Sequence, residues 1–284
     1  MKAAAFDYVK PKALSDALSL LEQGGDDAQL IAGGQTLLAT LNMRLSEPSI
    51  LIDITDIAEL KGISIVGEVL RIGALVTHTE IEDSELVAKH APLLKAAAPH
   101  IAHRAIRNLG TWGGSLAYGD PAAEWPACSL TLRATMVIQG PAGERKISAK
   151  DFFIDLYTTS LEPDEILVAT EIPLATSNQV FYFHELARRH GDYAVAGLAA
   201  VAQKQGNVLS NCAFTFFSVS STPVMAVGAQ DLVDGQSLDD ALIARAVTAA
   251  RDEIDAIADI TNSAEAKKHL IGVLLERGLK HLGA

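Results

Sequence analysis

The feature that most constrains the fold is an adjacent glycine pair placed between a predicted strand and a predicted helix. The segment AQLIAGG, residues 28–34, is typical of a short buried strand running into a turn, and TLLATLNMRL, residues 36–45, is typical of a helix. Glycine pairs allow positive φ angles and let another group approach the main chain where a Cβ would block it. A turn of this kind before a helix presents N–H groups to an anion, and Gln35 and Thr36 add side-chain donors.

A second glycine-rich stretch supports this interpretation, because a single glycine pair more often only turns the chain. Residues 107–127, RNLGTWGGSLAYGDPAAEWPA, place the pair Gly113 and Gly114 between hydroxyls at Thr111 and Ser115. The stretch is too long for a casual connection, so we interpret it as a functional loop. Two such loops can hold one pyrophosphate from both sides. Neither has the GxGxxG spacing or the lysine of a P-loop, which indicates a different nucleotide-binding fold.

The remaining pattern predicts an α+β chain of more than one domain, since 284 residues exceed the usual size of one hydrophobic core. We expect a helix at 13–23, strands from 50 to 76 with a hairpin at Gly67, a mainly helical stretch at 77–103, a hairpin at 135–148, and a strand at 164–173. Thr79 and Glu82 have capping-box spacing. The polar residues 175–179 mark a boundary, after which strands precede two amphipathic helices near 237–257 and 263–280.

Composition excludes several classes of partner. A net charge of −12 without any cluster of Lys and Arg argues against nucleic acid and anionic membranes. No apolar stretch reaches the roughly 20 residues that cross a bilayer, and the N-terminal segment lacks a hydrophobic signal core, so we expect a cytoplasmic protein. The two cysteines, Cys128 and Cys212, are far apart and outside any CxxC spacing, so neither a bound metal nor an iron–sulfur cluster is expected on this chain.

In their order and spacing, four segments resemble the FAD-binding medium subunits of molybdenum hydroxylases, the family of carbon monoxide dehydrogenase and xanthine dehydrogenase. AGGQTLL resembles the first pyrophosphate loop of that family, and NLGTWGGSLAYGDPAAEWPA the second FAD loop. LEPDEILVATEIP resembles the strand that passes the flavin, and ARRHGDYAVAG the start of the C-terminal domain. The likeness runs the full length of the chain.

The resemblance implies a two-lobed FAD-binding domain of the vanillyl-alcohol-oxidase-like type, with lobes at 1–56 and 57–175, and a C-terminal α+β domain at 176–284 with an antiparallel sheet and helices. It implies cofactor contacts at Ala32, Gly33, Gly34, Gln35, Thr36, Ile101, Ala102, Thr111, Gly113, Gly114, Ser115, Glu124, Leu167, Asp192 and Tyr193. It implies no catalytic residue and no metal ligand on this chain.

Some residues allow two interpretations. Related chains often carry a lysine where this one reads His184, and a protonated histidine could partly replace that cation beside a reduced flavin. Trp112 either packs beneath the second loop or stacks on the cofactor. His100, His103, Arg104 and Arg107 either neutralise phosphate or form a solvated basic helix end.

The function that the resemblance implies is an oxidoreductase subunit of a heterotrimer. A large subunit would oxidise substrate at a molybdenum cofactor, a small subunit would carry two 2Fe–2S clusters, and this chain's FAD would pass electrons to quinone, NAD or oxygen. A dimer of such heterotrimers is expected. The alternative is a self-contained FAD-dependent oxidase or reductase, for which the sequence offers no persuasive acid–base pair.

Overall fold

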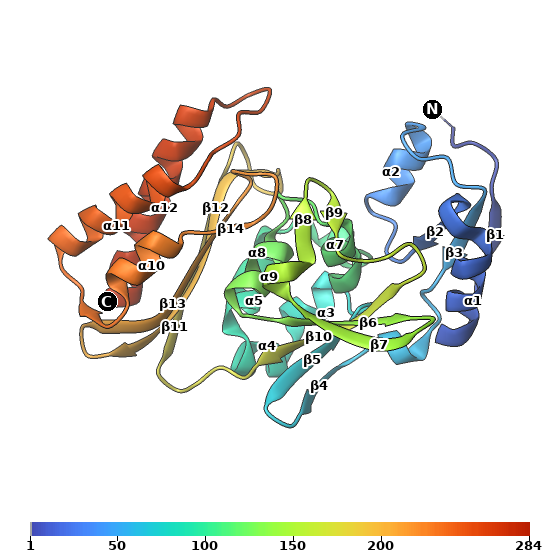
Figure 1. The fold of residues 1–284 in the computed structure, drawn as a ribbon, viewed down its shortest axis with the longest axis horizontal. Coiled ribbons are helices and arrows are strands. Elements are labelled where there is room, and N and C mark those ends of the chain that lie inside the picture. The colour runs from blue at the N-terminus through green and yellow to red at the C-terminus, as the bar shows by residue number, and fades with distance from the viewer. Residues whose placement is uncertain (1) are drawn as a thin grey trace.

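The computed structural model describes residues 2–284, which form three larger sheets arranged in a row and one small two-stranded sheet (Figure 1). The N-terminal sheet is parallel, has the order β1-β3-β2, and lies beside the helix α1. Its elements are β1 Asp7–Val9, α1 Leu14–Gly24, β2 Ala28–Ile31, α2 Leu37–Asn42 and β3 Ile50–Asp53. Ala17 and Leu21 of α1 reach a core that also contains Ile166 and Val168 of the next sheet, so the first two parts of the chain share one apolar core.

The middle sheet is antiparallel with the order β4-β5-β10-β6-β7. Its strands are β4 Ile63–Val66, β5 Val69–Gly73, β6 Thr135–Gly140, β7 Gly143–Ser148 and β10 Ile166–Pro173. The helices around it are α3 His78–Asp83, α4 Glu85–His90, α5 Pro92–Ala97, α6 Arg104–Arg107, α7 Trp112–Tyr118, α8 Glu124–Thr131 and α9 Ala149–Phe152, with the small strands β8 Phe153–Asp155 and β9 Thr158–Thr159. The predicted hairpin at Gly67 is present, with φ of 60° at that glycine.

The C-terminal sheet is covered on both faces, which explains why β12 reads as a nearly continuous run of small apolar residues. Its elements are β11 Gln179–Ala187, β12 Ala194–Gln205, β13 Val208–Phe217, β14 Val224–Met225, β15 Gln236–Ser237, α10 Val227–Val233, α11 Asp240–Glu253 and α12 Ala264–Gly283. One face, including Leu198 and Phe214, packs on these helices. The other face, including Phe183 and Phe217, packs on the helices of the middle lobe.

Two sequence predictions were wrong in detail. The capping box is formed by Thr77 and Glu80, not by Thr79 and Glu82, because the extended residue before α3 is Thr77, which bridges to Thr111. Residues 107–127 are not one loop, since α7 and the first residues of α8 lie within them. Glycine is required at residue 113 inside α7, because a Cβ there would overlap Ala74.

The packing of the C-terminal sheet depends on the absence of a side chain at Gly197. A Cβ there would overlap the ring of Phe217, which is fully buried and stacked on Phe183 at 5.7 Å between centroids. We predict that Gly197→Ala lowers the free energy of unfolding by about 1–3 kcal/mol, because overpacked side chains leave their preferred rotamers. Urea titration at unchanged m-value measures this loss.

Gly206→Ala is the control, since no atom lies within 4 Å of a Cβ at that hairpin turn and only its φ of 60° opposes the change. A Gly197→Ala midpoint equal to that of the wild type would contradict the packing described.

Candidate functional site

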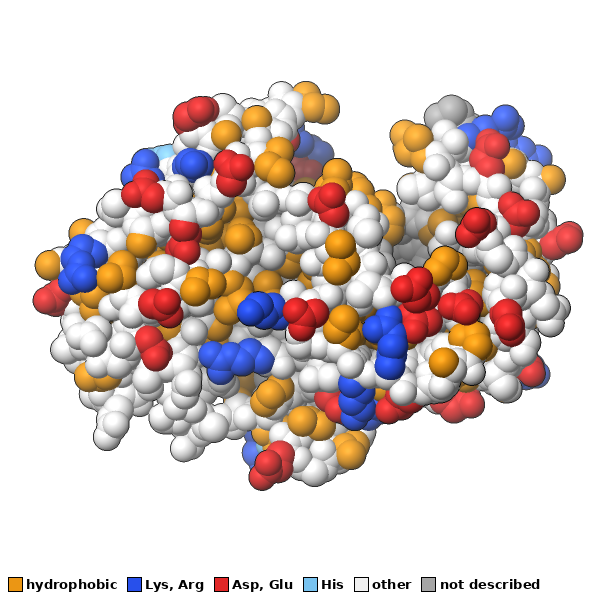
Figure 2. All heavy atoms as spheres, viewed as in Figure 1, with side chains coloured by type: hydrophobic (Ala, Val, Ile, Leu, Met, Phe, Trp, Pro, Cys, Tyr) orange, Lys and Arg blue, Asp and Glu red, His pale blue; other side chains and the backbone are white. Residues whose placement is uncertain are grey.

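The two glycine stretches meet in space. A Cβ on Gly33 would overlap the carbonyl oxygen of Leu109 and lie 2.9 Å from the Cα of Gly110, so the two backbones touch where residue 33 has no room for a side chain. The first stretch leads into α2 and the second into α7, and the surface is notched between these helices (Figures 1 and 2). Sequence positions about 80 apart are therefore parts of one site.

The first loop offers unused N–H groups. In the described part of the chain, the N–H groups of residues 33–36 donate no hydrogen bond to any main-chain or side-chain oxygen. Gly34 has a φ of 67°, which turns the chain so that α2 can begin immediately afterwards. The Gln35 side chain donates to the carbonyl of Gly33 at 3.0 Å, which braces the loop. Four successive donors thus remain for an external acceptor.

Most N–H groups of the second loop already donate hydrogen bonds within the protein. Gly113 donates to the Ala74 carbonyl at 2.8 Å, and Gly114 donates to the Thr111 hydroxyl at 3.1 Å. Ser115 donates to the Thr111 carbonyl at 3.1 Å. What this loop presents is therefore the backbone surface of Gly114 and the half-buried Ser115 side chain, held in place by the cap of α7.

A buried aromatic network supports the second loop from behind. Trp112 donates from its indole nitrogen to Thr170 at 2.9 Å, and Trp125 donates to Nδ1 of His78 at 2.9 Å. The main chain of His78 donates to the Gly110 carbonyl at 3.0 Å, and a Cβ on Gly110 would lie 2.7 Å from its ring. Trp112 is fully buried, so the interpretation that it packs beneath the loop is confirmed.

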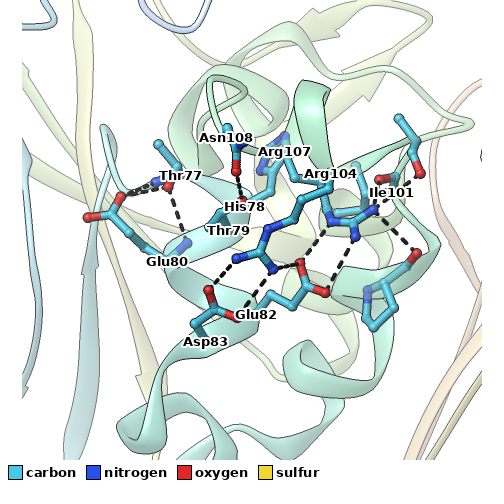
Figure 3. Close-up of polar contacts among 12 residues, drawn as sticks. Thr77, His78, Thr79, Glu80, Glu82, Asp83, Ile101, Arg104, Arg107 and Asn108 are labelled. Atoms are coloured by element: carbon cyan, nitrogen blue, oxygen red, sulfur yellow. Dashed lines mark hydrogen bonds and ion pairs between the residues drawn. The ribbon is translucent and has the colours of Figure 1, made fainter.

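Arg107 holds the segment that contains Ile101 and Ala102 (Figure 3). Its guanidinium donates to the Ile101 carbonyl at 2.8 Å and the Ala102 carbonyl at 3.2 Å. Glu82 neutralises it at 2.9 Å. Ala102 has a φ of 42°, which is rare for a residue with a Cβ, and the bonds from Arg107 keep this strained turn in place.

The predicted basic helix end is solvated in part, since His103 and Arg104 are exposed and Arg107 is buried. Arg107 is 7% exposed, and Arg104 pairs with Glu82 at 2.8 Å and also with Asp83. Thr79 donates to the side chain of Asn108 at 2.8 Å and ties α3 to the start of the second loop (Figure 3). These arginines already have carboxylate partners.

Glu124 begins α8 and lies near Glu185, in an acidic region apart from the glycine loops. Burial, followed by the nearby charge of Glu185, raises the pKa of Glu124 to about 8, so this side chain holds a proton at neutral pH. Glu185 faces Nδ1 of His100 at 3.6 Å. His100 directly precedes the segment 101–102, so the acidic region adjoins it.

The other predicted contacts lie in two places. Leu167 is a buried residue of β10 within the core. Asp192 and Tyr193 lie in the loop between β11 and β12, where Asp192 pairs with Arg188 at 3.2 Å and Tyr193 is 66% exposed. That loop borders a pocket of about 400 Å³ between the middle lobe and the C-terminal domain, which Asp120 and Lys267 also line. Desolvation by the groups around the pocket, followed by the charge of Asp120, raises the pKa of Tyr193 to about 12.

The sequence suggested His184 as a partial substitute for a cation beside the flavin. Burial lowers the pKa of its imidazole, and the neighbouring His100 and Arg277 lower it further, whereas the charge of Glu185 raises it. Desolvation and like charge outweigh Glu185, so the neutral ring is favoured.

Sequence reasoning missed three residues that position the site: His78, Gly110 and Glu185. Gly110 lies in the second glycine-rich stretch, directly before Thr111, and this position could have identified it. The other two carried none, since a histidine in a helical stretch and a glutamate in a strand are ordinary residues. Their roles follow from tertiary contacts.

The described residues include no group of three or more His, Cys, Asp or Glu side chains arranged to bind a metal. Both cysteines are buried and unpaired. Within residues 2–284 no helix is long and apolar enough to span a membrane.

The histidine behind the second loop predicts an acid sensitivity. Burial, followed by the charge of Arg107, lowers the pKa of His78 to about 4, against about 6.5 in an unfolded chain. Between these two pH values, His78 is protonated in the unfolded state and neutral in the folded state. Its contribution to the free energy of unfolding is therefore fully present above pH 6.5 and is lost as the pH falls toward 4, by about 3 kcal/mol at most. Urea unfolding at several pH values measures the slope.

His78→Gln keeps an acceptor for the indole of Trp125 and removes the titration. The decline in stability between pH 6.5 and 4 should become shallower in this variant. Equal slopes in the two proteins would show that His78 is not the group responsible.

Comparisons with known proteins agree over the whole chain. A family model described as the FAD binding domain in molybdopterin dehydrogenase matches residues 4–175, and one described as the CO dehydrogenase flavoprotein C-terminal domain matches residues 181–282. The chain is 38% identical to the 6-hydroxypseudooxynicotine dehydrogenase complex subunit alpha of Paenarthrobacter nicotinovorans, over 98% of this chain and 95% of that one. It is 35% identical to the carbon monoxide dehydrogenase medium chain of Hydrogenophaga pseudoflava, over 96% of each.

Solved structures give the same result. A carbon monoxide dehydrogenase chain from Hydrogenophaga pseudoflava superposes with a TM-score of 0.97 at 34% identity, covering 99% of this chain and 98% of that one. Quinoline 2-oxidoreductase from Pseudomonas putida 86 gives 0.94 at 38% identity, with the same coverage. The expected fold, an FAD-binding domain followed by an α+β flavoprotein domain, is confirmed. The chain belongs to the family of FAD-binding medium subunits of molybdenum hydroxylases.

Proposed function

We propose that this chain is the FAD-carrying electron-transfer subunit of a heterotrimeric molybdenum hydroxylase. In this proposal a large subunit oxidises the substrate at a molybdenum cofactor, and a small subunit with two 2Fe–2S clusters delivers the electrons. The medium subunit passes them to an external acceptor. Bound FAD would supply the chemistry, since a flavin accepts electrons singly and releases them in pairs.

The observation that carries the proposal is the set of four free N–H groups at residues 33–36, placed against the second loop by the contact between Gly33 and Leu109. Such successive donors bind a diphosphate. We assign the diphosphate to residues 32–36 and to Thr111, Gly113, Gly114 and Ser115, with the last four acting through backbone surface and hydroxyl more than through N–H groups.

The remaining assignments concern the nucleoside and flavin portions. We propose that Ile101, Ala102 and Leu167 make apolar or main-chain contacts, and that Glu124 accepts or donates a hydrogen bond to cofactor hydroxyls. Its raised pKa supports both roles, because the protonated carboxyl is both donor and acceptor. Asp192 and Tyr193 border the pocket beside the C-terminal domain and would lie at the edge of the ring.

We further propose domain limits at 1–56, 57–175 and 176–284. The separate sheets and the family matches to residues 4–175 and 181–282 support the last boundary. The shared core between β10 and α1 supports treating the first two lobes as one folding unit.

The alternative is a self-contained flavin oxidase or reductase. Such an enzyme needs an acid or base beside the flavin, and Tyr193, with its pKa raised to about 12, is poorly suited to lose a proton near neutral pH. The relatives whose names describe a subunit or a medium chain also favour the complex.

Purification separates these proposals. The chain alone should show flavin absorption bands without turnover, and co-expression with its neighbouring genes should yield a complex whose large and small chains are identified by mass spectrometry. That complex should reduce a dye with carbon monoxide, an aldehyde or an N-heterocycle. Turnover by the isolated chain would contradict the subunit proposal.

We predict that Gly33→Ala abolishes most FAD binding. The added methyl group overlaps the Leu109 carbonyl, so the two loops must separate and the free N–H groups lose their common direction. The dissociation constant, measured by quenching of flavin fluorescence, should rise at least about 100-fold.

Gly67→Ala provides the control, because it adds a methyl group at a positive φ in a distant hairpin where no atom lies within 4 Å. It should cost some stability and leave FAD affinity unchanged. Wild-type affinity in Gly33→Ala would sink the assignment of this loop.

A further inference from the structure

Glu185 is a buried acidic residue with an unused oxygen. It lies in β11, on the face of the sheet toward the middle lobe, and its side chain is 5% exposed. One carboxyl oxygen, Oε1, faces Nδ1 of His100 at 3.6 Å. The other, Oε2, is buried and has no hydrogen-bond partner among the described residues. A buried acceptor of this kind destabilises the protein unless a partner arrives.

Among the described residues, no neighbour of Glu185 donates a hydrogen bond to Oε2. Glu124 on α8 is close enough for the charge of Glu185 to disfavour its ionisation, and Asp120 adds to this effect. Cys128, one turn further along α8, is influenced by both glutamates. His184, the next residue along β11, and the ring of His100 complete the titratable surroundings. The region is therefore acidic, with His100 as the group that faces Glu185 directly.

The position of Glu185 joins two segments that we have assigned to the cofactor. His100 precedes Ile101 and Ala102, and Glu124 begins the helix that follows the second glycine loop. These segments reach Glu185 from different parts of the middle lobe, while Glu185 comes from the C-terminal domain. A group bound between them would be enclosed from three sides.

We propose that Glu185 is a further cofactor-orienting residue, whose free Oε2 accepts a hydrogen bond from an N–H or O–H donor of bound FAD. This inference rests on the proposed function. The donor belongs to the uncharged flavin and ribityl portion, because the buried carboxylate of Glu185 would repel a diphosphate. The diphosphate end of the cofactor meets N–H donors at residues 33–36, and the flavin end meets oxygen acceptors.

Glu185→Gln tests this, because glutamine keeps the size of the side chain and removes its charge. FAD should bind on the order of tenfold more weakly to the variant, since a hydrogen bond to a charged acceptor is replaced by one to an amide. The absorption bands of the bound flavin should also shift, which a purely structural role would not produce. Without FAD, the melting temperature of the variant should equal or exceed that of the wild type, because a buried unpaired charge has been removed.

The matched control is Glu171→Gln, in which a carboxylate paired with Lys146 at 2.9 Å and Arg71 at 3.3 Å is neutralised on a different sheet. It should leave FAD affinity and spectrum unchanged. If Glu185→Gln does not fold, Glu185→Asp keeps the charge and shortens the side chain, and the same weakening is expected. Wild-type affinity and spectrum in either folded variant overturn the inference, whereas failure of the wild type to bind FAD overturns the proposed function instead.

Discussion

The approach of Gly33 to the carbonyl of Leu109 is the contact on which the rest of the site depends. It joins the N-terminal sheet to the helical layer of the middle lobe at a point where residue 33 has no room for a Cβ. Main-chain hydrogen bonds from Trp112 and Gly113 to the carbonyls of Val76 and Ala74 hold the second loop in place. The first loop rests against it at Leu109, and no described oxygen accepts a hydrogen bond from the N–H groups of residues 33–36.

Polarity divides the site into two ends. Free N–H groups lie at residues 33–36, and two carboxyl groups, those of Glu124 and Glu185, lie near the boundary with the C-terminal domain, close enough for the charge of Glu185 to raise the pKa of Glu124. A ligand that is anionic at one end and rich in neutral donors at the other fits this arrangement, and FAD has that character. The net charge of the chain is −12, so its overall field does not attract an anion. The attraction for a diphosphate therefore comes from the local N–H donors.

Sequence alone predicted what local chemistry determines. The strand, glycine pair and helix at residues 28–45 and the hairpins at Gly67 and at 135–148 follow from turn residues and periodicity, and the structure has them. The helix α7 was missed because two adjacent glycines suggest a loop, and the need for glycine at residue 113 arises from its close packing on Ala74. Glu185 was missed because a single buried carboxyl group in a strand has no periodic or motif signal, and its significance depends on α8 and on His100 from another part of the chain. The full-length resemblance supplied the family, which spacing could not.

The central claim is that the first loop supplies N–H donors and the second loop supplies a fixed surface for one diphosphate. Hydrogen–deuterium exchange of the purified chain with and without FAD tests it residue by residue. The account predicts that FAD slows exchange strongly at the amides of residues 33–36 and has little effect at residues 113–115, whose amides are already bonded within the protein. Unchanged exchange at 33–36 in FAD-loaded protein would contradict it.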